Sequence, residues 1–130
     1  MTRVGAALLL ALAAISGCAT PTGQAVEINV HYSHFGPSAV TVRAGVPTTI
    51  VLRNDDPIDH EWIVGDEQVH AVHRTGTELL HGDRPTEVTL PALSLRTTTV
   101  TFDKPGQYLY ICHLPGHEAY GMVGTLTVVP

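Results

Sequence analysis

Apolar and polar residues alternate along short stretches of the chain, which is the pattern of β-strands with one buried face. In residues 26–30, for example, Val26, Ile28 and Val30 alternate with polar residues. Turn-forming residues separate this stretch from further β-branched and apolar stretches. These are residues 39–42, 48–53, 60–64, 88–90, 97–102, 108–112 and 123–129. Seven or eight short strands at this spacing predict an all-β fold, either a β-sandwich or a small barrel.

Residues 67–85 interrupt this pattern, because they are polar, rich in histidine and without regular alternation. We expect a long loop there, with a helical turn or short strands. The rest of the chain shows no internal repeat, low-complexity tract or helical periodicity that competes with the β-rich prediction. The length of 130 residues allows one domain.

The charge balance is acidic, with a formal net charge of −5 at pH 7. The 7 Lys and Arg residues are scattered singly along the chain, so we expect no nucleic-acid partner. The 8 histidines are more than a chain of this size needs, and they require an explanation.

The N-terminus has the features of an export signal, because Arg3 precedes an apolar run that is too short to span a bilayer. Ile15-Ser16-Gly17-Cys18 then resembles the lipobox of bacterial lipoproteins. We predict a lipoprotein signal peptide at 1–17, a lipidated Cys18 with its tether at 18–25, and a folded domain at 26–130. The alternative is a plain secretory signal in which Cys18 carries no lipid. If Cys18 is lipidated, we expect the lipid to anchor the exported protein to the outer face of the cell membrane or the periplasmic side of the envelope.

A lipid on Cys18 would leave Cys112 as the only thiol, because the chain has 2 cysteines. No intramolecular disulfide can then form, and an unpaired thiol in an oxidising compartment needs protection. Metal ligation would supply that protection.

Cys112, His117 and Met122 follow one another with four residues between each pair, and they offer a thiolate, an imidazole and a thioether. His60, at the start of an earlier predicted strand, offers a second imidazole. Two imidazoles, one thiolate and a weak axial thioether are the ligands of blue-copper electron-transfer sites. Soft sulfur suits Cu(I) and imidazole suits both oxidation states, so a rigid site of this kind reorganises little on reduction.

The predicted strands bring these residues to one end of the fold. Cys112 ends one strand and Met122 begins the next, with Pro115-Gly116 making the bend between them. His60 enters from a neighbouring strand, and Met122 shares the inward-facing parity of Leu126.

The ligand loop and its flanks carry a family resemblance. The most specific segments are Tyr110 to His117 and Gly121 to Leu126, and weaker matches are Phe35-Gly36-Pro37, Ala44-Gly45 and Phe102 to Gly106. With these motifs, the chain from Val26 to Val129 resembles the cupredoxin family of plastocyanin-like and azurin-like blue copper proteins. The resemblance implies a cupredoxin-like Greek-key β-sandwich that binds one type 1 copper ion through His60, Cys112, His117 and Met122.

From this resemblance we expect a monomer that carries single electrons between redox proteins of the envelope. In the family, the loop histidine lies near an apolar docking surface, which implies that redox partners dock near His117. The residues of that surface would be Phe35, Pro37, Leu114, Pro115 and Tyr120. Such contacts are expected to be small and weak, because turnover requires release.

Other functions remain open at this stage. The protein could buffer or deliver copper, with residues 67–85 as the point of transfer. Cys112-His113 is similar to the pair that links two copper centres in copper oxidases, but those enzymes need more histidine ligands and more domains. We therefore expect no enzymatic activity of its own. A structural or adhesive sandwich without a blue absorption is the remaining alternative.

The other histidines are weaker signals. His70, His73 and His81 could form a second copper or zinc site, since nearby imidazoles bind both metals, but we favour a solvated loop. His31 and His34 could flank the copper loop, and an ordinary polar surface explains them equally well.

Two further expectations concern charged residues. Asp55, Asp56 and Asp59 form an acidic cluster that we interpret as a solvated turn rather than a partner-binding patch. The resemblance to cupredoxins implies a hydrogen bond between the residues that follow the two strand ligands, here Glu61 and His113. We expect them to pair as carboxylate and imidazole, which would raise the pKa of His113. The alternative is that both side chains are exposed and contribute little.

Overall fold

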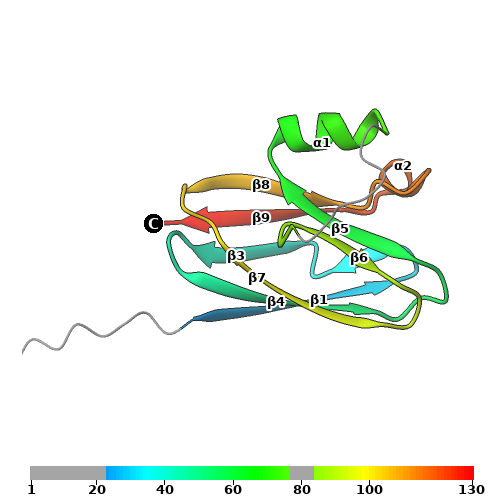
Figure 1. Ribbon diagram of the computed structural model, residues 1–130, viewed down its shortest axis with the longest axis horizontal. Coiled ribbons are helices and arrows are strands. Elements are labelled where there is room, and N and C mark those ends of the chain that lie inside the picture. The colour runs from blue at the N-terminus through cyan, green and yellow to red at the C-terminus, as the bar shows by residue number, and fades with distance from the viewer. Residues whose placement is uncertain (1–22, 77–83) are drawn as a thin grey trace, which may run out of the picture.

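Two β-sheets packed face to face form the body of the protein (Figure 1). The structure is a computed structural model that describes residues 23–76 and 84–130. One sheet has the order β2-β1-β4-β7, with β1 (Gln24–His31), β2 (His34–Gly36), β4 (Pro47–Asn54) and β7 (Leu95–Thr101). The other has the order β3-β9-β8-β5-β6, with β3 (Ala39–Arg43), β9 (Val123–Val129), β8 (Gly106–Ile111), β5 (His60–Gly65) and β6 (Glu87–Leu90).

Every stretch predicted as a strand forms one, and the predicted all-β Greek-key sandwich is confirmed. The short strand β2 is additional, and it pairs antiparallel with the end of β1. Two pairings are parallel, β1 with β4 and β3 with β9, and they join strands that are distant along the chain.

Residues 67–74 form the helix α1 (Glu67–Arg74), which is longer than the helical turn that was one of the structures expected within a loop there. The carboxylate of Asp66 caps this helix by accepting hydrogen bonds from the backbone N–H groups of Gln68 and Val69. The helix lies on the outer face of the five-stranded sheet, and it buries His70 and His73 there (Figure 1). His81 lies outside the described residues. A second, single-turn helix α2 (His117–Tyr120) forms part of the loop between β8 and β9.

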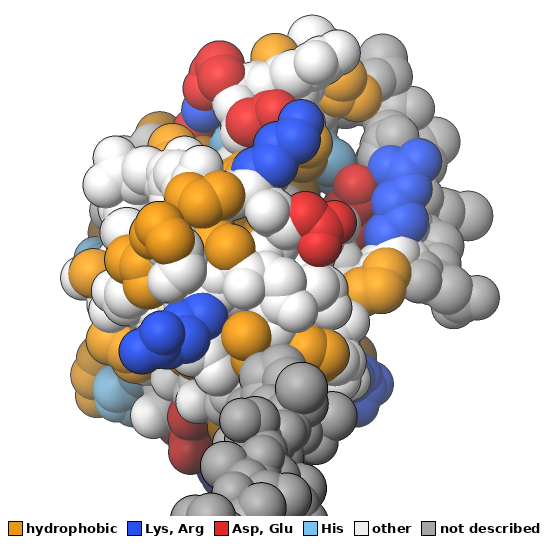
Figure 2. Space-filling model, turned by 90° about the vertical axis from the view of Figure 1, so that its left-hand side faces the viewer, with side chains coloured by type: hydrophobic (Ala, Val, Ile, Leu, Met, Phe, Trp, Pro, Cys, Tyr) orange, Lys and Arg blue, Asp and Glu red, His pale blue; other side chains and the backbone are white. Residues whose placement is uncertain are grey.

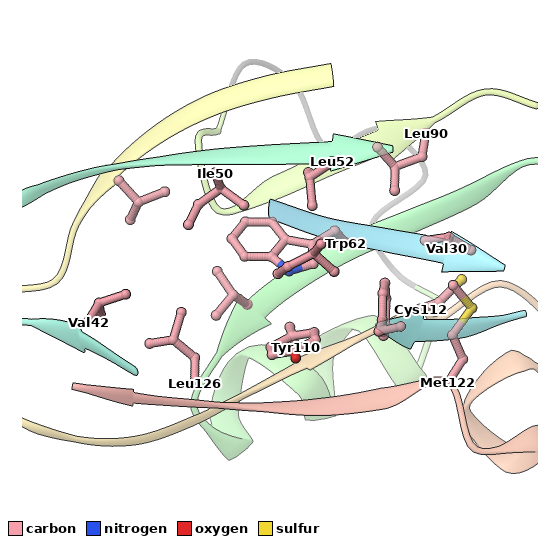
Figure 3. Packing of buried hydrophobic residues seen from close by; sticks show 14 of the residues in the cluster. Val30, Val42, Ile50, Leu52, Trp62, Leu90, Tyr110, Cys112, Met122 and Leu126 are labelled. Carbon is pink, nitrogen blue, oxygen red and sulfur yellow. The ribbon is translucent and has the colours of Figure 1, made fainter. Parts of the chain in front are cut away.

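The space between the sheets is filled by side chains of both layers, with Trp62 and Tyr110 as the largest (Figure 3). The hydroxyl of Tyr110 donates a hydrogen bond to the carbonyl of Pro37 at 2.6 Å, and its ring packs edge-on against Phe35. Phe35 is only 6% exposed. It therefore belongs to the core and not to a docking surface, which corrects the expectation for this residue.

The start of β1 and the C-terminus lie at the end of the sandwich opposite α2 (Figure 1). Figure 2 looks at that end, where the Lys and Arg side chains in view are separated by apolar, acidic and other polar groups. Neither α1 nor α2, the helices of the described ranges, is long and apolar enough to cross a membrane.

Candidate metal centre

Three of the predicted ligands meet at one end of the sandwich. His60 begins β5, Cys112 directly follows β8, and His117 begins α2. The Nδ1 atom of His117 lies 3.2 Å from Nδ1 of His60 and 3.2 Å from Sγ of Cys112. The three ligand atoms all lie within 4.8 Å of one another, so one ion can contact all of them.

The chemistry of this donor set fits copper. His60 and Cys112 are fully buried, and His117 is partly exposed at the surface end of the cluster. The nitrogen and sulfur atoms of three side chains from different parts of the fold converge there, so a single cation could be shared by all of them. Two imidazoles and one thiolate suit a copper ion that alternates between Cu(I) and Cu(II).

The loop that carries the ligands is held by its own backbone. The N–H of Cys112 donates to the carbonyl of Met122 at 3.2 Å, and the N–H of Met122 donates to the carbonyl of His117 at 3.0 Å. Gly116 and Gly121, which flank α2, have φ of 84° and 102°, a conformation that favours glycine. Met122 is fully buried and lies beside Cys112 in Figure 3. Its role as the axial ligand stays a prediction.

Asp56 is a residue of the centre that the sequence analysis missed. The turn was expected to be solvated, and Asp55 and Asp59 are indeed exposed, but Asp56 is only 5% exposed. Its carboxylate accepts hydrogen bonds from Nε2 of His60 at 2.9 Å and from the backbone N–H groups of Tyr32 and Ser33, each at 2.7 Å. Its position four residues before His60, next to Pro57, was the only signal in the sequence.

The hydrogen bonds at Asp56 determine its charge. Burial alone would raise the pKa of this carboxyl group, but the bonds from Ser33 and Tyr32, followed by the contact with His60, outweigh it and lower the pKa. Asp56 is therefore ionised at neutral pH. Because it accepts the Nε2 proton of His60, the Nδ1 atom of this imidazole is left to bind a metal ion.

Glu61 and His113 are in contact, but not as the sequence analysis expected. The carboxylate of Glu61 accepts a hydrogen bond from the backbone N–H of His113 at 2.9 Å, while the imidazole of His113 points to α1. Burial lowers the pKa of His113 and outweighs the opposing effect of Glu118, so the predicted rise is wrong. Both residues are largely buried, so the alternative of two exposed groups is also wrong.

His31 and His34 lie at the same end of the protein as the metal centre. Nδ1 of His31 is 3.8 Å from Oδ1 of Asp56, and the ring of His34 contacts that of Tyr120 with a centroid distance of 5.1 Å. Both histidines are exposed. They therefore flank the copper loop and also belong to the polar surface.

The fold and this ligand set define a copper protein of the cupredoxin class. The chain belongs to the plastocyanin/azurin family of copper-binding proteins, because the model of that family matches residues 24–129.

Known relatives and solved structures agree with this assignment. The copper-resistant cuproprotein CopI of Pseudomonas aeruginosa is 28% identical over 86% of this chain and 80% of its own. CopI of Rubrivivax gelatinosus is 32% identical, and the match spans 72% of this chain and 59% of that protein. Auracyanin-B of Chloroflexus aurantiacus is 34% identical over 62% of this chain and 40% of its own length. The crystal structure of reduced auracyanin from Roseiflexus castenholzii superposes with a TM-score of 0.69 at 26% identity, over 83% of this chain and 98% of that one.

Proposed function

We propose that this protein carries single electrons between redox proteins of the cell envelope. The observation that supports this function is the convergence of His60, Cys112 and His117 within 4.8 Å in a buried site. Bound copper would supply a one-electron couple there. The protein's own part is to hold two imidazoles and a thiol in place. The carboxylate of Asp56 accepts a hydrogen bond from His60, and that of Glu61 accepts one from the backbone N–H of His113, next to Cys112. Such fixed ligands keep the geometry similar in both oxidation states.

Redox partners would dock at the end of the sandwich that carries His117. Pro115 and Tyr120 are exposed next to this residue, and Leu114 is half-buried. Pro37 is also exposed, and we propose that it belongs to the same docking surface. A small contact of this kind favours short-lived complexes, as expected of a monomeric carrier.

A lipid on Cys18 would keep this carrier at a membrane surface, facing the outside of the cell or the periplasm. Residues 1–22 lie outside the described part of the chain, so the signal peptide and the lipid attachment rest on the sequence motif alone. We expect no enzymatic activity of its own, since the proposed copper centre is one ligand set in one domain.

Copper handling is the second function that an observation favours. Two relatives of this chain are named copper-resistant cuproproteins, and these matches cover more of it than the match to auracyanin-B does. In that case the protein would bind copper to limit its toxicity or to pass it to another protein. Residues 67–85 would then be the point of transfer.

Visible and EPR spectra of the copper-loaded protein test the site, and the fate of copper separates the two functions. An electron carrier should show an intense thiolate-to-copper absorption, lose it in Cys112→Ser and retain it in His34→Gln, an exposed histidine near the same end. It should also cycle reversibly between oxidation states without losing metal. Rapid loss of Cu(I) to a metal-free acceptor protein would favour copper delivery instead. A colourless copper complex would contradict the proposed centre.

A further inference from the structure

Three buried imidazoles form a second cluster on the outer side of the five-stranded sheet. His70 and His73 come from α1, and His113 follows Cys112 in the ligand loop. The ring centroids of His70 and His113 are 5.2 Å apart, and those of His73 and His113 are 5.4 Å apart. His70 is completely buried, and the side chains of His73 and His113 are 4% and 5% exposed. None of the three is a ligand of the proposed copper centre.

Backbone carbonyls orient the two helix histidines. The Nε2–H of His70 donates to the carbonyl of Leu109 at 3.2 Å, and the Nδ1–H of His73 donates to the carbonyl of Val69 at 2.8 Å. The ring of His70 is thereby held in the tautomer that has its proton on Nε2 and a lone pair on Nδ1. Metal-ligating histidines are held in this way, with one ring N–H bonded to a carbonyl or carboxylate and the other nitrogen on the ion.

The Nδ1 atom of His70 faces His113 and accepts its Nε2 proton in the metal-free protein. Nδ1 of His70 and Nε2 of His113 are 3.0 Å apart, close to the 3.2 Å between the facing Nδ1 atoms of His60 and His117 in the copper centre. The nitrogen atoms of His70 and His113 are therefore about as far apart as those of His60 and His117, which would share one copper ion.

Acidic groups surround the cluster. Oε2 of Glu118 lies 3.5 Å from Nδ1 of His113, and Oε2 of Glu87 lies 3.8 Å from Nε2 of His73. Two guanidinium groups lie near these carboxylates: Arg84 pairs with Glu87 at 3.0 Å, and Arg74 is bound to two carboxylates, which more than offset its charge. Those carboxylates are Glu67 and Glu118.

The cluster is also suited to binding a cation at neutral pH and within reach of solvent. Burial lowers the pKa of His70, so this ring is neutral and its lone pair is available. A pocket of about 400 Å³ is lined by His73, Arg74, His113 and Glu118 among others, so it reaches the cluster on the side of His73 and His113.

We propose that His70 and His113 bind a second metal ion, a divalent cation of the Zn²⁺ or Cu²⁺ type, separate from the copper held by Cys112. Water from the pocket completes its coordination, and His73 stacks on His113 and supports that ring. Imidazole ligands suit both ions, and the absence of sulfur distinguishes this site from the copper centre. This site is independent of whether the protein carries electrons or delivers copper.

Equilibrium dialysis of the untagged, copper-loaded protein against Zn²⁺ tests the proposal. Elemental analysis should find one added equivalent of zinc, while the blue absorption shows that copper remains in place. His70→Gln should weaken zinc binding at least tenfold, and His73→Gln should weaken it less. His34→Gln, an exposed histidine outside the cluster, is the matched control and should bind zinc as the wild type does.

Two results would overturn the proposal: no zinc bound by the wild-type protein, or equal zinc binding by His70→Gln. Loss of the blue absorption would reveal that His70→Gln fails to fold. In that case, NMR spectra of the wild-type protein with and without zinc test whether His70 and His113 are ligands. Zinc should shift the imidazole nitrogen signals of both His70 and His113. Unchanged signals from these two rings would exclude them as ligands.

Discussion

The Nε2 atom of His60 lies 2.9 Å from Oδ2 of Asp56, so a buried carboxylate orients the ligand that β5 contributes to the copper centre. The same carboxylate also binds the backbone of Tyr32 and Ser33 in the turn between β1 and β2. One side chain therefore connects both sheets to the metal site.

Replacing this carboxylate should affect both the copper centre and stability. In Asp56→Asn, the reduction potential of copper should rise, because a negative charge that favours Cu(II) is lost. The free energy of unfolding of the metal-free protein should fall by about 1–3 kcal/mol, since the buried hydrogen bonds are no longer all satisfied. Voltammetry and urea denaturation measure the two effects.

The pH dependence of the same variant provides a second comparison. The pKa of Asp56 is lowered in the folded state, so its contribution to stability is present above the ordinary value of 3.8 and is lost as pH falls through the lower folded value. Asp56→Asn should therefore lose less stability in acid than the wild type. The exposed neighbour Asp55 supplies the control variant Asp55→Asn, and equal potentials in the two variants would contradict the role of Asp56.

Met122→Leu should retain copper and its colour but raise the reduction potential. The reason is that a weak axial donor that stabilises Cu(II) would be replaced by a hydrocarbon of similar size. Spectroelectrochemistry of the purified protein gives both the absorption and the potential. An unchanged potential would remove Met122 from the copper centre.

Copper binding at pH 7 should release one proton from Cys112. Burial raises the pKa of this thiol to about 11, so the metal-free protein holds it protonated, whereas copper binds the thiolate. Calorimetry in two buffers with different heats of ionisation counts the released protons. Cys112→Ser should release none, and the same proton count in that variant would mean that another group loses the proton.

Cys18→Ala tests the membrane anchor. The variant should carry no lipid, and the protein should remain either uncleaved or in the soluble fraction. Metabolic labelling with a radioactive fatty acid, followed by fractionation, distinguishes it from the wild type. Equal labelling of both proteins would show that Cys18 is not the site of lipid attachment.

Gly124→Ala should destabilise the sandwich. Gly124 is paired with Tyr110 across β9 and β8, and a Cβ atom at residue 124 would lie 2.1 Å from the tyrosine ring. The ring cannot move away without losing its hydrogen bond to Pro37, so we expect a loss of about 1–3 kcal/mol in the free energy of unfolding. Gly36→Ala is the control in urea denaturation, because its Cβ would meet no atom within 4 Å. Equal stabilities would contradict this packing.

The strands could be predicted because strand formation leaves a local pattern of alternating residues. The helix α1 was expected only as a possible helical turn within a loop, although Asp66 as its cap and the spacing of His70 and His73 were local signals for a longer helix. Its buried face consists partly of imidazoles, which a pattern of apolar residues does not reveal. Polarity was therefore mistaken for exposure.

Local spacing predicts more of the copper centre than of the neighbouring imidazole cluster. Cys112 and His117 lie close together in one loop, so their spacing alone predicts that they meet. The contact of His113 with His70 joins residues 43 positions apart, and the direction of the His113 side chain depends on how α1 packs against the sheet. No local rule determines such an orientation.

The course of β1 has a consequence for how the protein could work at a membrane. This strand begins at Gln24, at the end opposite α2, and its last residue, His31, lies beside Asp56 at the copper end. Its 8 residues span roughly 26 Å at about 3.3 Å per residue. In a domain tethered by its N-terminus, the point of attachment and the metal ligands would therefore lie about one strand length apart, at opposite ends of the sandwich. An upright orientation of such a domain would turn the copper end away from the bilayer, toward partners in the aqueous layer.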